Sequence, residues 1–100
     1  MIASYLNKEE KPEGLVALDF KDDSIELSYF SGDTTVLDHN QIQAIHKDVT
    51  KIVIDVKNKK KVYGIPYSYF SYDDLQKMKI DVDRVSQKIS TLPKEYPAYN

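Results

Sequence analysis

The side chains with the clearest chemical potential are two histidines and a neighbouring aspartate. Asp38 and His39 are adjacent, and His46 follows in the same part of the chain. Zinc sites take their ligands mostly from Cys and His at short, regular spacings, but the chain has no Cys and only these two His. No serine–histidine or paired-carboxylate arrangement can be placed either. We therefore expect no metal, no cofactor and no enzymatic activity, and we interpret the three as polar loop residues.

A second group of candidate residues is aromatic. Its members gather around Pro66, and they are Tyr63, Tyr67, Tyr69, Phe70 and Tyr72. Tyrosines exposed beside a sheet edge suit protein or peptide binding, since they offer rigid, amphipathic contact area. Alternatively, Phe70 and one or two of the tyrosines pack between the last predicted hairpin and the helix that follows it. Both interpretations can hold for different members, so the four tyrosines are candidate binding residues.

A third group is basic and lies at the tip of a predicted hairpin. Its members are Lys57, Lys59, Lys60 and Lys61. Lysines near an anionic surface add about 1 kcal/mol each to binding, so these four are candidates for contact with phosphate or anionic lipid. The alternative is a solvated turn whose charges prevent edge-to-edge aggregation. The formal net charge of −2 favours that alternative, and it also argues against a nucleic-acid partner.

Acidic side chains predominate at the start of the chain. Residues 1–35 contain eight acids against three lysines, whereas residues 36–72 contain six lysines against three acids. Four of these acids surround the first predicted hairpin turn, and they are Asp19, Asp22, Asp23 and Glu26. Their spacing is not that of a calcium loop. They form either a plain solvated turn or an acidic face for a basic partner.

The element that must organise these groups is a helix predicted over residues 71–89. Its apolar residues recur three or four positions apart, which places on one stripe Leu75, Met78, Val82, Val85 and Ile89. Ser71 precedes the first turn, and Asp74 follows three residues later, as in a capping box. Ile80 falls off the stripe. The alternative is therefore a break there, with Asp81 capping a second short helix.

Strands precede this helix. Alternating or β-branched runs predict strands at residues 15–20, 25–30, 34–37, 51–57 and 61–67. Residues 2–6 are expected to form a short edge strand or an apolar arm, and residues 8–14 a charged loop. Ile42 and Ile45 lie three positions apart, which suits an irregular or one-turn helical link better than a clean strand.

The length of 100 residues predicts one domain, which we place at residues 1–92, with residues 93–100 as a short tail. Five or six strands followed by one helix indicate an α+β, mainly β fold. We expect a strongly bent antiparallel sheet, or a partly open barrel, closed by the C-terminal helix. The chain shows no signal peptide and no segment of transmembrane length. Together with the absence of Cys, this favours a cytoplasmic protein.

The pattern resembles the bacterial pleckstrin-homology-like domains of small uncharacterised proteins over residues 15–89. The segments that carry the resemblance are residues 35–45, 51–56 and 62–70, with the helix that follows. The resemblance implies a bent antiparallel sheet, nearly a barrel, plugged by the C-terminal helix. Family members commonly lie beside membrane segments, which this chain lacks. The fold serves many unrelated kinds of binding.

We therefore expect a non-enzymatic protein-binding or assembly module, which binds a protein partner or itself. Residues 62–65 carry little charge, so an open edge there predicts a symmetric dimer or a larger ring. Gly64 would permit close approach of another backbone. The alternative is a small regulator or inhibitor, for instance one encoded by a mobile element, whose acidic first hairpin engages a basic site on another protein. That interaction would weaken strongly with salt.

Overall fold

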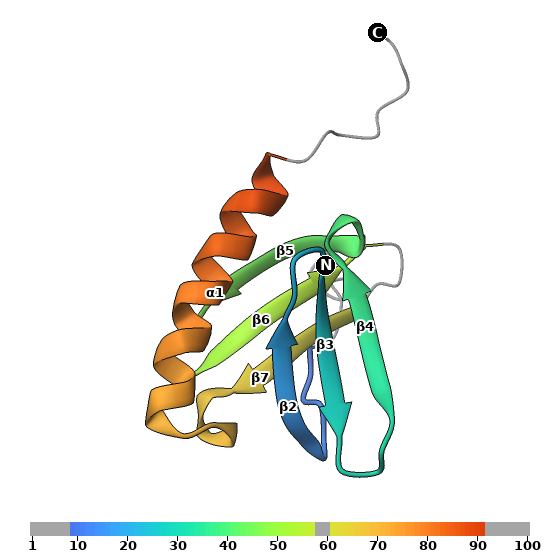
Figure 1. The fold of residues 1–100 in the computed structure, drawn as a ribbon, viewed down its shortest axis with the longest axis vertical. Coiled ribbons are helices and arrows are strands. Elements are labelled where there is room, and N and C mark those ends of the chain that lie inside the picture. Colours follow the sequence, from blue (N-terminus) through green and yellow to red (C-terminus); the bar gives the residue numbers. More distant parts are fainter. Residues whose placement is uncertain (1–8, 58–60, 92–100) are drawn as a thin grey trace, which may run out of the picture.

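The computed structural model describes residues 9–57 and 61–91. Two bent sheets lie against each other, and a single long helix runs beside them (Figure 1). The elements are β1 (Glu9–Glu10), β2 (Leu15–Phe20), β3 (Ser24–Tyr29), β4 (Thr34–Asp38), a 3-10 turn (His39–Gln41), β5 (Ile42–Lys47), β6 (Lys51–Val56), β7 (Lys61–Pro66), a second 3-10 turn (Tyr67–Tyr69) and α1 (Tyr72–Ser90). The sheets do not close into a barrel. The predicted class, α+β and mainly β with one C-terminal helix, is confirmed.

Three predicted segments lie outside the described residues. They are the arm or edge strand at residues 2–6, the hairpin tip at residues 58–60 and the tail at residues 93–100. Within the described ranges, no helix has the length and apolar character needed to cross a bilayer.

The three-stranded sheet has the order β2-β3-β4, and its pairs are antiparallel. A tight turn at residues 22–23 joins β2 to β3, where the Lys21 N–H donates to the Ser24 carbonyl at 2.8 Å. Gly32 takes a φ of 97° in the next turn, a conformation that residues with a side chain rarely adopt. β2 lies at one edge of this sheet, and no other described strand pairs with its outer side.

The four-stranded sheet has the order β1-β7-β6-β5. Its β5 corrects a sequence prediction, because residues 42–47 form a strand and not an irregular or helical link. The pairing register shifts between Ile42 and Ala44, which inserts one extra residue into β5 as a bulge. The bulge returns Ile45 to the face of Ile42, and both side chains are buried. Two apolar residues three positions apart therefore fit one strand.

β1 corrects a second prediction, since the charged loop expected over residues 8–14 contains a short strand. β1 runs parallel to β7, with Glu9 opposite Val62 and Glu10 opposite Tyr63. The edge of β7 that we expected to be open is therefore covered at these two positions. The described residues form seven strands, against the five or six predicted.

Gly64 makes room for a side chain of its own chain. The Glu9 side chain crosses Gly64 and accepts a hydrogen bond from Lys51 Nζ at 2.5 Å. A Cβ at position 64 would lie 2.6 Å from Glu9 Cδ, which is closer than real contacts allow. The close approach that we expected from another backbone is occupied here by Glu9.

The core lies between the sheets and α1, which packs against β5. Val82 and Val85 are buried, whereas Leu75, Met78 and Ile89 are half-buried at the margins of the predicted stripe. α1 is continuous through Ile80, so the alternative of a break there is wrong. The helix begins as predicted, with Ser71 Oγ accepting from the Asp74 N–H at 3.2 Å. On its other flank, Asp83 pairs with Lys47 of β5 at 2.9 Å.

The burial of α1 can be tested at Val85. Val85→Asp should lower the free energy of unfolding by about 4 kcal/mol or more, because an unpaired carboxylate would enter the core. Gln87→Asp is the matched control, since it adds the same charge at an exposed position of the same helix. Urea unfolding followed by circular dichroism measures both. A curve for Val85→Asp that overlaps the wild-type curve would contradict the burial of the stripe.

The Glu9–Gly64 contact predicts a dependence of one substitution on another. Glycine in a strand costs about 0.5–1 kcal/mol relative to alanine, so Gly64→Ala should stabilise the protein once Glu9→Ala has cleared the space. In the wild-type background the new Cβ must displace Glu9 and break its ion pair with Lys51, which offsets that gain. A double-mutant cycle in urea measures the coupling. Equal effects of Gly64→Ala in both backgrounds would disprove the contact.

Candidate functional site

The structure divides the predicted aromatic cluster among different surroundings. Tyr63 is buried, with 7% of its surface exposed, and belongs to the core. Tyr67 is half-buried, and its hydroxyl donates to the Asp48 carbonyl at 2.5 Å. Lys79 Nζ lies 5.0 Å from the centroid of the Tyr67 ring. Burial raises the pKa of Tyr67. These two tyrosines therefore serve packing, as the alternative interpretation proposed.

The remaining members of the cluster lie nearer the surface. Tyr69 and Phe70 are half-buried and meet edge to face, with ring centroids 6.4 Å apart. Both line a groove beside α1. Tyr72, at the first position of α1, is 75% exposed and lies outside that groove. Of the four candidate tyrosines, only Tyr69 lies in the groove.

Of the predicted basic group, the structure describes Lys57 and Lys61, and an interaction of the charged side chain is seen for Lys61. Lys61 Nζ lies 5.1 Å from the Tyr63 ring centroid and 3.4 Å from Glu10 Oε1. The interaction with Tyr63, followed by that with Glu10, raises the pKa of Lys61. The Lys57 N–H donates to the Gln41 carbonyl at 2.8 Å. Lys59 and Lys60 lie outside the described residues.

A cavity of about 740 Å³ opens between the two sheets, beside β1. Its walls include Glu10, Tyr29, Phe30, Lys61 and Tyr63. Burial raises the pKa of Tyr29, and Phe30 stands 87% exposed at the rim.

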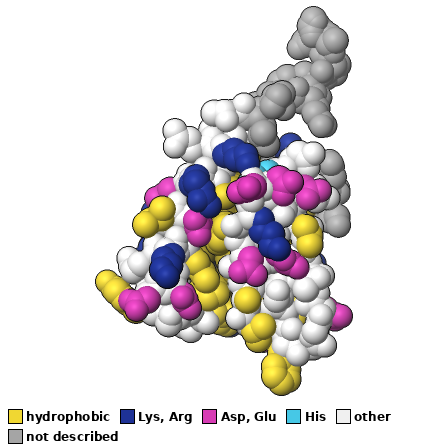
Figure 2. Space-filling model, viewed as in Figure 1, with side chains coloured by type: hydrophobic (Ala, Val, Ile, Leu, Met, Phe, Trp, Pro, Cys, Tyr) yellow, Lys and Arg dark blue, Asp and Glu magenta, His cyan; other side chains and the backbone are white. Residues whose placement is uncertain are grey.

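A groove of about 440 Å³ lies between β2 and the first half of α1, and we name it the β2–α1 groove. Its apolar lining comes from Leu18, Phe20, Tyr69, Phe70 and Met78. The alternation of β2 turns Leu18 and Phe20 toward the helix side, and Met78 is the half-buried margin of the α1 stripe. Figure 2 shows hydrophobic side chains in a strip between α1 and β2, with charged side chains on both sides.

The charged lining of the β2–α1 groove is mainly acidic. Asp19 comes from β2, whereas Asp74, Lys77 and Asp81 come from α1. Asp81 pairs with Arg84 at 2.9 Å. Asp19 and Asp74 are exposed and form no ion pair with another described residue. The groove therefore presents two exposed carboxylates beside an apolar floor, and Asp19 also helps to raise the pKa of the nearby Lys21.

The β2 backbone along this groove is unpaired on its outer side. Antiparallel pairs alternate between those that exchange hydrogen bonds and those that do not. The bond from Lys21 to Ser24 fixes this alternation at the turn. From the Lys21–Ser24 pair toward the start of β2, every second residue bonds to β3. Asp19 and Ala17 therefore bond to β3, whereas Leu18 and Phe20 direct their N–H and carbonyl groups outward. No described backbone or side-chain group bonds to those outward groups.

Of the four acids of the first hairpin, Asp19 and Glu26 lie opposite each other on β2 and β3, whereas Asp23 lies apart from them. Asp19 lines the groove, and Glu26 pairs with Lys21 at 2.9 Å. The hydrogen bond from Lys21 to Glu26 raises the pKa of Lys21. Lys88 of α1 donates to the Asp22 carbonyl. Asp23 lies instead beside His39.

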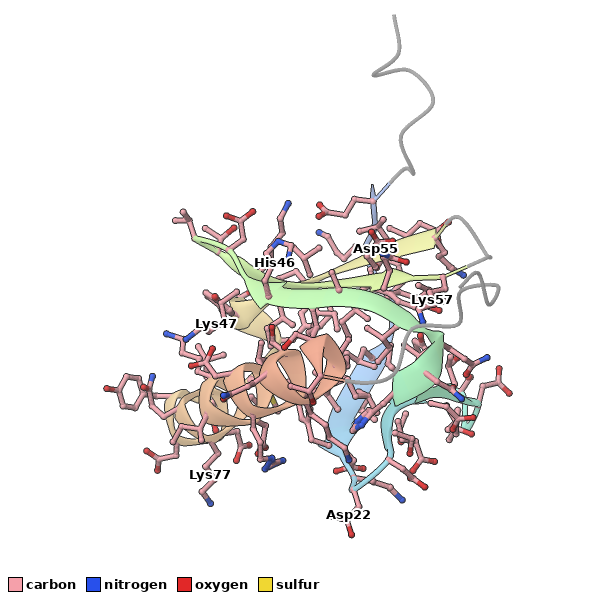
Figure 3. The ribbon with its side chains drawn as sticks, turned by 90° about the horizontal axis from the view of Figure 1, so that it is seen from above. Asp22, His46, Lys47, Asp55, Lys57 and Lys77 are labelled. Atoms are coloured by element: carbon pink, nitrogen blue, oxygen red, sulfur yellow. The ribbon has the colours of Figure 1, made fainter. Side chains whose placement is uncertain are left out.

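The two histidines do not share a site. Asp38 ends β4 and His46 lies in β5, so the interpretation as loop residues is wrong for these two, whereas His39 lies in the 3-10 turn. His46 is an exposed residue of β5 and projects from the face opposite α1 (Figure 3). His39 is buried, with 5% of its surface exposed, and neither ring nitrogen has a hydrogen-bond partner. Asp38 is exposed, and its N–H donates to Gln41 Oε1 at 3.0 Å. No three His, Asp or Glu side chains within the described ranges could together hold a metal ion.

Several charges face the buried imidazole of His39. Burial lowers its pKa below the ordinary value of 6.5, and Lys88 and Arg84 of α1 lower it further. Asp23 in the first hairpin turn and Asp38 before the 3-10 turn act in the opposite direction. His39 is therefore held in its neutral form where the first hairpin, the 3-10 turn and α1 meet.

A pH dependence of stability follows from His39. Between its folded pKa and 6.5, the unfolded chain binds more protons than the folded protein. Neutral His39 therefore makes its whole contribution to the stability of the folded protein above pH 6.5. This contribution is lost as the pH falls through the pKa of His39 in the folded protein. The slope of unfolding free energy with pH should reach at most about 1.4 kcal/mol per unit.

His39→Leu tests this dependence, because it removes the titrating group and two unsatisfied nitrogens together. Urea unfolding between pH 7 and pH 5 should show a smaller slope in this variant, and its stability at pH 7 should not fall. His46→Gln, at the exposed position on β5, is the matched control and should keep the wild-type slope. An unchanged slope in His39→Leu would assign the pH dependence to other groups.

The β2–α1 groove is the candidate site, and the residues that line it are described. It combines an apolar floor, an unpaired strand edge and exposed acids. Sequence reasoning grouped Tyr69 with Phe70 but did not join them to β2, because β2 and α1 lie about fifty residues apart in the chain. Comparison with protein-family models, curated proteins and solved structures finds no match to this chain.

Proposed function

We propose that this protein is a non-enzymatic protein-binding module with a pleckstrin-homology-like fold, and that the β2–α1 groove receives its partner. The observation that supports this most directly is the unpaired outer edge of β2 beside an apolar floor. Folded proteins normally pair, cover or block such an edge. An edge left open next to hydrophobic side chains is a surface suited to another polypeptide.

The dimensions of the groove also favour a polypeptide. Residues 16–20 of β2 extend over about 13 Å, and residues 71–81 rise over about 15 Å along the helix. The two walls line the same groove over these lengths. An extended segment of about four or five residues would match this length.

Other partners that the sequence suggested receive less support. Assembly through β7 would have to use the part of its edge that β1 leaves free. A regulator acting through an acidic hairpin would meet Glu26 already paired with Lys21. Contact with anionic lipid would depend on Lys57, Lys59 and Lys60, since Lys61 already lies beside Glu10.

Photo-crosslinking in the native host tests the proposal. A photoreactive amino acid replaces Val16 on the β2 wall or Lys77 on the α1 wall, both of them exposed groove residues. Val49, which is 86% exposed and outside the groove, is the matched control position. We expect both groove positions to crosslink the same protein in high yield, and the Val49 position to give none of this product.

Two outcomes would contradict the proposal. One is the absence of any crosslinked protein from both groove positions at native expression levels. The other is an equal set of products from the groove positions and from the Val49 position, because nonspecific encounters would produce that pattern.

A further inference from the structure

We infer that the β2–α1 groove binds an extended, basic and apolar segment of a partner protein by adding it as a strand to β2. This inference rests on the proposed function and specifies both the mode of binding and the chemistry of the partner. Three features of the groove support it: the backbone groups of β2, the apolar floor and the charged side chains.

The first step concerns the backbone. Leu18 and Phe20 each direct one N–H and one carbonyl away from β3 toward the groove. An added strand would pair with these four groups and continue the ladder of the three-stranded sheet. Such main-chain hydrogen bonds provide affinity with little dependence on the partner's sequence.

The second step concerns side chains. Residues of an added strand point alternately to opposite faces, so every second one would face the interior of the groove. There it would meet Tyr69, Phe70 and Met78, which are half-buried in the free protein. Apolar residues at alternate positions of the partner would complete the burial of these three side chains.

The third step concerns charge. Asp19 and Asp74 are on opposite walls, and Lys77 is the groove's only described basic residue. A partner segment with lysine or arginine beside its apolar residues would pair with both carboxylates, whereas an acidic segment would be repelled. Basic residues alternating with apolar residues therefore match both the floor and the rim.

Charge and composition also argue against two other occupants, which are a second copy of this chain and residues 93–100. A second copy of this chain pairing through β2 would bring its own Asp19 toward the acids of the groove, where like charges repel. Residues 93–100 of this chain contain Pro93 and Pro97, which cannot donate to a strand ladder. They also contain Glu95, which would lie near groove acids.

Short fluorescent peptides in which valine alternates with lysine are the probe, and their binding to the full-length protein is measured by anisotropy. The matched peptide has glutamate in place of lysine. Two further valine–lysine peptides carry N-methyl groups on every second backbone nitrogen. In one peptide the valine nitrogens are methylated, and in the other the lysine nitrogens are, so each peptide is blocked along one edge of the extended strand only. We expect N-methylation of one edge to weaken binding at least about tenfold and of the other edge to change it little. The glutamate peptide should not bind.

Variants of the protein test the charge step. Asp19→Asn and Asp74→Asn should each weaken binding of the valine–lysine peptide about two- to fivefold at low salt. Asp73→Asn is the matched control, since Asp73 is exposed in the same first turn of α1 but does not line the groove. Loss of affinity in Asp73→Asn equal to that in Asp74→Asn would point to a general effect of charge and would overturn the pairing.

Amide hydrogen exchange measured by NMR locates the bound strand. In the free protein, the amides of Leu18 and Phe20 should exchange faster than those of Ala17 and Asp19. Peptide binding should protect Leu18 and Phe20. Peptide binding without this protection would overturn strand addition but leave the proposed function intact. If Leu18 and Phe20 are as protected as Ala17 and Asp19 in the free protein at every protein concentration, a segment of this chain occupies the groove and the inference is wrong. If the protection of Leu18 and Phe20 grows with protein concentration, a second copy occupies the groove and the inference is also wrong.

The proposed function and the addition of a basic strand to β2 can be disproved separately. If Val16 and Lys77 crosslink a partner in the host but no valine–lysine peptide binds, this inference is wrong and the proposed function stands. If neither crosslinking nor peptide binding occurs, both are wrong.

Discussion

The packing of α1 against β5 determines what the rest of this fold exposes. Val82 and Val85 are fully buried in that contact, whereas a helix of this composition would be marginal alone in water. Helix formation and closure of this side of the core are therefore one event. Because the sheets do not close into a barrel, the position of α1 also decides which strand edge stays accessible. It covers β5 and leaves the outer side of β2 open beside its first half (Figure 1).

Elements with an unbroken local period could be predicted from the sequence. The α1 stripe, its Ser71 cap and the alternating runs of β3, β6 and residues 17–20 of β2 depend on residues that are neighbours in the chain. β5 could not be predicted in this way, because its bulge breaks the alternation between Ile42 and Ile45. β1 has no local signal at all. It exists through pairing with β7 and through the ion pair of Glu9 with Lys51, both of which join distant parts of the chain.

The candidate site was predictable only in part, for the same reason. The tyrosines were recognised as a group, but only the folded chain separates the core residue Tyr63 from the groove residue Tyr69. The burial of His39 was not predicted, although the sequence contained a signal for it. His39 follows the buried Leu37 by two positions, and residues two apart in a strand point to the same face. Alternation beyond the last apolar residue of a strand is informative when the next inward residue is polar. The groove itself arises from the meeting of β2 with α1, so neither segment alone indicates it.

The two sheets treat their open edges differently. At β7, the edge is covered by β1, and Glu9 crosses Gly64 to reach Lys51. At β2, no described strand covers the edge, and the neighbouring acids Asp19 and Asp74 form no ion pair with another described residue. Charge beside an edge is a common means of preventing self-association, but it leaves the backbone groups themselves free to pair. The same carboxylates that disfavour a second copy of this chain therefore lower the free energy of binding for a strand of opposite charge. Edge protection by charge, unlike protection by a covering strand, is selective among partners.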